Sequence, residues 1–98
     1  MSDRLYVTAR FTAKADRVED MIELLTALAT KTRDESGCVD YGYYQSSDAP
    51  SEFTSIETWD GAESEAAHWE TEHLKEALSR LPELMDGEVE ITKYSKVA

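Results

Sequence analysis

Residues 53–73 read FTSIETWDGAESEAAHWETEH and decide the fold, because a strand here passes directly into a helix. Successive side chains of a strand point to opposite faces, so alternate residues share a face. Four residues fall on one face of the predicted strand: Phe53, Ser55, Glu57 and Trp59. A carboxylate and an indole are therefore expected side by side on a surface that is otherwise apolar or small.

The segment after this strand has the pattern of a helix that is interrupted. Asp60, with Glu63 three residues later, is typical of a helix start and predicts a helix from residue 61 or 62. The apolar stripe loses its helical phase in the five-residue step from Trp69 to Leu74. We expect a break near residues 70–72, with Thr71 capping a further helix that ends before a proline at position 82.

The remaining elements follow from the same periodicities. Apolar residues alternate over 5–11, recur at helical spacing after Asp16 as far as residue 32, and give way to β-branched and aromatic residues over 38–46. Gly37 suits a helix C-cap, Asp86-Gly87 a turn, and residues 89–94 a last strand. The order is β-α-β-β-α-β with a broken second helix, which predicts one α+β domain of ferredoxin-like type over residues 1–98.

Such a sheet carries its helices on one face and leaves the other open. The chain has no further element to cover that face, so a second copy packed sheet against sheet is expected, giving a homodimer.

Composition limits the partners and the compartment. With 21 acidic and 10 basic residues the formal charge is −11, which argues against nucleic acid and anionic membranes as partners. A single cysteine, Cys38, is typical of a reducing compartment, and no long apolar segment is present. We expect a cytoplasmic protein that does not bind membranes.

Several short motifs resemble a known family. Glu35-Ser-Gly37-Cys38, Phe53-x-x-x-Glu57-x-Trp59, Ala67-His68 and Thr71-x-His73-Leu74, at these separations, are similar to the antibiotic biosynthesis monooxygenase superfamily of dimeric α+β barrels. The likeness covers nearly the whole chain. The family includes cofactor-independent oxygenases of quinols and anthrones, haem-degrading oxygenases, an isomerase of a phosphorylated sugar, and many members of unknown activity.

The haem-degrading branch is not favoured by this sequence. Its members resemble one another in a phrase similar to Phe-x-x-Ala-His, whose histidine binds iron. Here Leu74-Lys-Glu-Ala77 is followed by Leu78, so the ligand is missing. No dinucleotide fingerprint is present either, and no cofactor is expected.

His68 and His73 are the only imidazoles and the natural proton carriers. Either could instead be a hydrogen-bonded structural residue. Glu57 could act as a base, orient His68, or simply accept hydrogen bonds that tie strand to helix. The spacing of five between the histidines is not that of a one-turn metal pair, so no metal site is expected.

Aromatic residues supply the candidate binding surface. Tyr41, Tyr43, Trp59 and Trp69 are expected to bind an aromatic substrate together with His73, although such residues more often form core or dimer packing. The leading hypothesis is a cofactor-independent monooxygenase that acts on a quinol-like or polyphenolic substrate with dioxygen, with His68 and Glu57 as catalytic residues. The alternatives are a non-catalytic binding module and an isomerase on the same fold.

Overall fold

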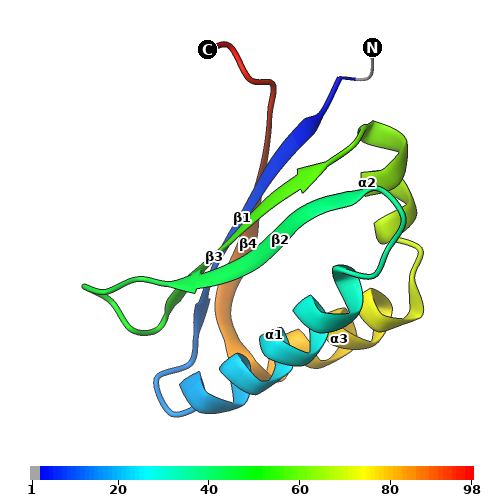
Figure 1. The fold of residues 1–98 in the computed structure, drawn as a ribbon. Coiled ribbons are helices and arrows are strands. Elements are labelled where there is room, and N and C mark those ends of the chain that lie inside the picture. Colours follow the sequence, from blue (N-terminus) through cyan, green and yellow to red (C-terminus); the bar gives the residue numbers. More distant parts are fainter. Residues whose placement is uncertain (1–2) are drawn as a thin grey trace.

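The computed structural model describes residues 3–98, which form a four-stranded antiparallel sheet with helices on one face (Figure 1). The elements are β1 (Leu5–Ala13), α1 (Val18–Thr32), β2 (Cys38–Gln45), β3 (Glu52–Trp59), α2 (Ala62–His68), α3 (Glu72–Leu84) and β4 (Met85–Tyr94). The strand order is β2-β3-β1-β4. This confirms the predicted α+β ferredoxin-like fold and the broken second helix.

The alternation predicted for β3 is confirmed. Phe53, Ser55, Glu57 and Trp59 are buried at 3%, 0%, 6% and 0% exposure, whereas Ile56, on the opposite face, is 49% exposed. β3 pairs along its full length with β1, and on its other side with β2. It is thus an inner strand, and its buried face looks toward the helices.

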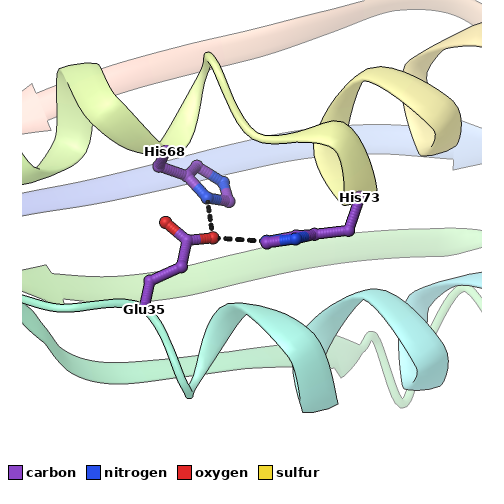
Figure 2. Close-up of side chains that lie close together, drawn as sticks. All are labelled: Glu35, His68 and His73. Atoms are coloured by element: carbon purple, nitrogen blue, oxygen red, sulfur yellow. Dashed lines mark hydrogen bonds and ion pairs between the residues drawn. The ribbon is translucent and has the colours of Figure 1, made fainter.

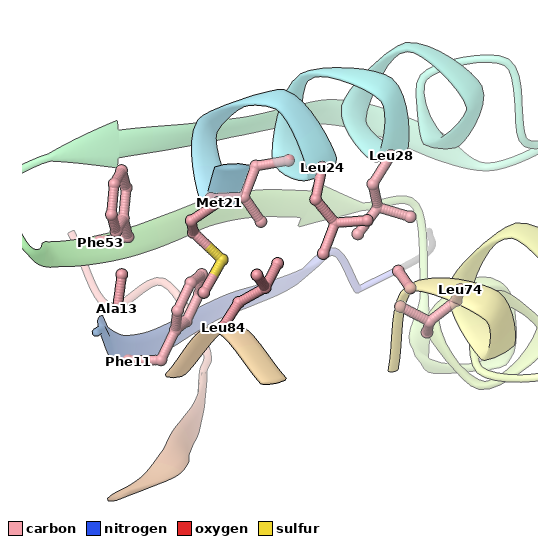
Figure 3. Close-up of a cluster of buried hydrophobic side chains, with 10 residues drawn as sticks. Phe11, Ala13, Met21, Leu24, Leu28, Phe53, Leu74 and Leu84 are labelled. Carbon is pink, nitrogen blue, oxygen red and sulfur yellow. The ribbon is translucent and has the colours of Figure 1, made fainter. Parts of the chain in front are cut away.

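Hydrophobic packing between that sheet face and the helices forms the main core (Figure 3). Phe11 and Phe53 stack at a ring separation of 6.0 Å, and Met21 of α1 is fully buried above them. Leu28 and Leu74 join α1 to α3 in the same cluster. Burying such side chains is the dominant stabilising term.

Several predicted helix caps were wrong, although α1 ends at residue 32 and α2 begins at residue 62, as predicted. The N-cap of α1 is Arg17, without a side-chain cap, and the helix ends at Thr32, five residues before the expected C-cap glycine, Gly37. Asp60 does not cap α2 either: its carboxylate accepts a 2.5 Å hydrogen bond from the Ser64 hydroxyl, and Gly61 takes the N-cap position. The predicted cap of α3 is confirmed, since the Thr71 hydroxyl accepts from the Leu74 N–H at 3.3 Å.

The end of α3 also differs from the prediction. Pro82 lies inside the helix, which continues to Leu84 and passes straight into β4 without a turn at Asp86-Gly87. Leu84 is only 2% exposed, so its burial holds the last turn despite the proline. Gly87, with φ of +73°, instead lies at an irregularity in the pairing of β1 with β4.

A bulge near the start of β2 decides which of its side chains face the helices. The pairing shifts between Cys38 and Asp40, so Val39 is the extra residue and is 45% exposed. Strict alternation would place Val39 on the same face as Tyr41 and Tyr43. The extra residue changes the phase, and only the two tyrosines point toward the helices.

Gly37 brings the loop after α1 against α2. Its φ is +88°, and a Cβ at this position would overlap the Ser64 side chain and lie 2.7 Å from Asp60 Oδ1. Gly87 has a similar φ of +73° but open space around it. A side chain at Gly87 would therefore carry only the conformational cost of a positive φ. A side chain at Gly37 would carry that cost and a steric clash as well.

We expect Gly87→Ala to lower the free energy of unfolding by about 1–2 kcal/mol, the cost of a left-handed backbone with a Cβ. Gly37→Ala should cost clearly more, because the loop must also move away from α2. Denaturant unfolding of the two variants measures both. Equal losses would show that the contact with Ser64 is not tight.

Candidate active site

A cavity lies between the sheet and the helices, and most of the residues proposed from the sequence line it. Its volume is about 60 Å³, enough for a few water molecules. Five of the predicted site residues line it: Tyr41, Tyr43, Glu57, His68 and Trp69. Trp59 and His73 are not among the lining residues. The walls are otherwise mainly apolar, with Leu78 and Ile91 partly exposed, at 38% and 42%.

Glu57 is held by its own strand. Its Oε2 accepts a 2.6 Å hydrogen bond from the Ser55 hydroxyl, and its Oε1 accepts one at 3.0 Å from the Trp59 indole N–H. Period-two spacing places all three side chains on the same face. Both carboxylate oxygens are thus engaged, which is the structural role considered for Glu57 from the sequence.

His68 is enclosed by aromatic rings. Its ring centre lies 4.9 Å from that of Trp59, 5.5 Å from that of Tyr41 and 6.3 Å from that of Trp69. The residue is only 3% exposed. Because the packing fixes the plane of the imidazole, its two nitrogens point in defined directions.

The partner of His68 is Glu35, a residue that sequence reasoning did not propose for the site (Figure 2). His68 Nδ1 lies 2.7 Å from Glu35 Oε2, and His73 Nε2 lies 2.5 Å from the same oxygen. The side chains of Glu35 and His73 are 11% and 19% exposed. The structure therefore brings both histidines together, but through Glu35 and not through Glu57.

This contact selects the tautomer of His68. An ionised carboxylate only accepts hydrogen bonds, so the neutral ring must carry its proton on Nδ1. Nε2 then bears a lone pair, and it has no hydrogen-bond partner within residues 3–98. Since His68 lines the cavity, a lone pair on its Nε2 can accept a proton or a hydrogen bond.

Glu65 is a second carboxylate that the sequence did not single out as buried. Acidic residues are frequent from Glu63 to Glu90, a pattern typical of a solvated face, yet Glu65 is 4% exposed. It accepts hydrogen bonds from Trp69 Nε1 at 2.6 Å and from Lys93 Nζ at 3.1 Å. The i, i+4 spacing of Glu65 and Trp69 is the sequence signal that could have identified this pair.

Tyr41 and Tyr43 form a hydroxyl pair on the cavity wall, 2.7 Å apart. Burial raises the pKa of both phenols well above the ordinary value. Burial, together with the nearby Glu35 and Glu57 carboxylates, raises the pKa of the Cys38 thiol to about 11. These groups are therefore neutral at physiological pH, and Cys38 packs against the core beside Trp59 and Tyr41.

The fold and this cavity define a class of small α+β proteins with a cavity between an antiparallel sheet and a broken helix. The model of the antibiotic biosynthesis monooxygenase family matches residues 4–80, and the chain belongs to that family.

Solved structures share the fold. A conserved protein from Methanosarcina mazei is 33% identical, with a TM-score of 0.93 over 98% of this chain and 95% of its own. PA3566 from Pseudomonas aeruginosa is 31% identical, with a TM-score of 0.90 over 100% and 98% of the two chains. An uncharacterised protein of Synechocystis, sll1783, is 26% identical over 94% of this chain, which spans 63% of its length.

The raised pKa values have a consequence for stability. Groups that bind protons more tightly in the folded state stabilise it less once pH exceeds their unfolded pKa. We expect the free energy of unfolding to fall as pH rises above about 9, where the thiol ionises only in the unfolded chain, and more steeply above about 10, where the phenols do.

Chemical denaturation between pH 7 and 11 tests this expectation. Cys38→Ala should remove the part of the slope that begins near pH 9, and Tyr41→Phe should reduce the part above pH 10. A free energy of unfolding that stays constant over this range would contradict the burial of ionisable groups.

Proposed function

We propose that this protein is a cofactor-independent monooxygenase acting on a quinol-like or polyphenolic substrate. The observation that carries the proposal is the arrangement of His68: Nδ1 is bound to Glu35, and the ring borders an apolar, aromatic cavity. Membership of the antibiotic biosynthesis monooxygenase family supports it. Residues 1–98 would form one domain of this family.

In the proposed reaction, His68 Nε2 takes a proton from a substrate hydroxyl or activated C–H, and Glu35 stabilises the imidazolium that forms. The resulting anion is electron-rich enough to reduce dioxygen directly. One oxygen atom enters the substrate and the other leaves as water, with all four electrons supplied by the substrate. The protein contributes a dry cavity and a proton acceptor.

The substrate needs more room than the cavity of about 60 Å³ provides. Leu78 and Ile91 stand partly exposed at the edge of the cavity, so rotation of these two side chains would admit a flat aromatic ring. Tyr41, Tyr43 and Trp69 would then contact its faces and edges. Trp59 and His73 would act indirectly, through their hydrogen bonds to Glu57 and Glu35 respectively.

Oxygen uptake by metal-free protein supplied with menadiol or an anthrone tests the proposal. We expect His68→Ala to lower the rate about 10²–10⁴-fold, the usual contribution of a general base. Glu35→Gln should lower it less, because a neutral amide still orients the ring but stabilises imidazolium poorly. Wild-type uptake no faster than the uncatalysed reaction, or an undiminished rate in His68→Ala, would rule the mechanism out.

Turnover without oxygen would instead favour the isomerase, and tight binding without turnover would favour the binding module.

Among the described residues no helix is long and apolar enough to cross a membrane.

We also propose that the open face of the sheet is the interface of a homodimer. Tyr44, Ile56 and Tyr94 are 55%, 49% and 49% exposed. Ile56 lies opposite Thr8 and Gly42 in the central pairings, which leaves an apolar centre on a face without a helix.

Sedimentation velocity at micromolar concentration should therefore show a dimer. Ile56→Asp should convert it to a monomer, because a charge buried in such an interface is strongly unfavourable. The matched control is Ile22→Asp on α1, an apolar residue of 40% exposure away from the open face. A monomeric wild-type protein, or an Ile56→Asp protein that stays dimeric, would contradict the proposed interface.

A further inference from the structure

Glu35, His68 and His73 form a cluster that the proposed reaction uses only in part. Their ligand atoms, one from each residue, all lie within 4.8 Å of one another. Two of the three separations are hydrogen-bond distances to a single carboxylate oxygen, 2.7 Å and 2.5 Å. Two imidazole nitrogens and a carboxylate oxygen make up a donor set typical of divalent transition metals.

We propose that this cluster is a Zn²⁺ site, bound by Glu35 Oε2, His68 Nδ1 and His73 Nε2, that regulates the cavity from outside. In this arrangement the metal ion replaces the protons that the two rings share with the carboxylate. A solvent molecule completes the tetrahedral coordination.

The geometry needs only a small adjustment. Zinc bonds of about 2.0–2.1 Å in a tetrahedral site separate neighbouring donor atoms by about 3.3 Å, so Glu35 Oε2 must move away from each nitrogen by roughly 0.6–0.8 Å. The two nitrogens, which lie within 4.8 Å of each other, must take the same spacing. Glu35 lies in the loop between α1 and β2, and its side chain is 11% exposed. It can therefore shift outward, while the aromatic rings around His68 keep that ligand in place.

The donor set and the net charge favour this class of ion. Mg²⁺ and Ca²⁺ prefer all-oxygen sites, whereas imidazole suits zinc and its neighbours in the first transition row. The formal charge of −11 also attracts cations to the molecule.

The site lies outside the cavity. Neither Glu35 nor His73 lines the cavity, and both are partly open to solvent, so an ion can enter from the surface. The coordination position held by the solvent molecule would likewise face solvent and not the substrate. This placement favours a regulatory ion over one that activates dioxygen.

Binding of the ion would change the face that His68 presents to the cavity. With the metal on Nδ1, the neutral ring keeps its proton on Nε2, and this nitrogen becomes a donor in place of an acceptor. This consequence rests on the proposed function of His68 as the base. It predicts that Zn²⁺ inhibits oxygen uptake, and that inhibition follows the binding curve of the ion.

Titration of the metal-free protein with Zn²⁺, followed by calorimetry, and with Co²⁺, followed by its visible absorption, tests the site directly. We expect one ion per chain with tetrahedral Co²⁺ bands. Glu35→Gln and His73→Asn should each weaken Zn²⁺ binding more than about 100-fold. Even the mutation of a residue that only hydrogen-bonds to a metal ligand typically lowers metal affinity about 10–100-fold. The matched control is Glu72→Gln, the same change at an exposed carboxylate beside His73, and its affinity should equal that of the wild type.

A second measurement guards against variants that fail to fold. Excess Zn²⁺ should raise the Tm of the wild type and of Glu72→Gln, and should leave that of a folded Glu35→Gln protein unchanged. Absence of one-to-one binding in the wild type, or equally tight binding by Glu35→Gln, would overturn the site. Because these readouts do not depend on turnover, they stand or fall separately from the proposed oxygenase activity.

Discussion

The hydrogen bonds from Glu35 Oε2 to His68 and His73 are the constraint on which the arrangement of the site depends. They join the loop after α1 to the end of α2 and the start of α3, across 33 and 38 residues of sequence. On one continuous helix, residues five apart would point about 140° away from each other. The break between α2 and α3 removes this difference, and both rings reach a single oxygen.

The sequence predicted the break between α2 and α3, but not the contact of both histidines with Glu35. The lost phase between Trp69 and Leu74 and the capping pattern of Thr71 predicted an interruption at the correct place. The alternation in β3 likewise predicted the buried face of Glu57, because period two admits one interpretation once Trp59 and Phe53 are apolar. Local periodicity thus determined most of the fold.

The errors share a different cause. Glu35 has no periodic signal, because it lies in a loop whose partners are more than 30 residues away. At Val39 and Pro82, tertiary packing overrides the local preference. Val39 is displaced by a bulge, and Pro82 stays inside a helix because Leu84 is buried. A single sequence shows which residues share an element, but distant loops that meet across a core leave no trace in local patterns.

The carboxylates of Glu57 and Glu35 have different capacities for chemistry. Glu57 already accepts a hydrogen bond on each oxygen, so using it as a base would require breaking one of them. Glu35 leaves its histidine partner with a nitrogen directed away from it, at the cavity wall. Among residues 3–98, His68 is the member of the Glu35, His68 and His73 cluster that also lines the cavity. A change on its Nδ1, in the cluster, therefore alters its Nε2 through a single aromatic ring.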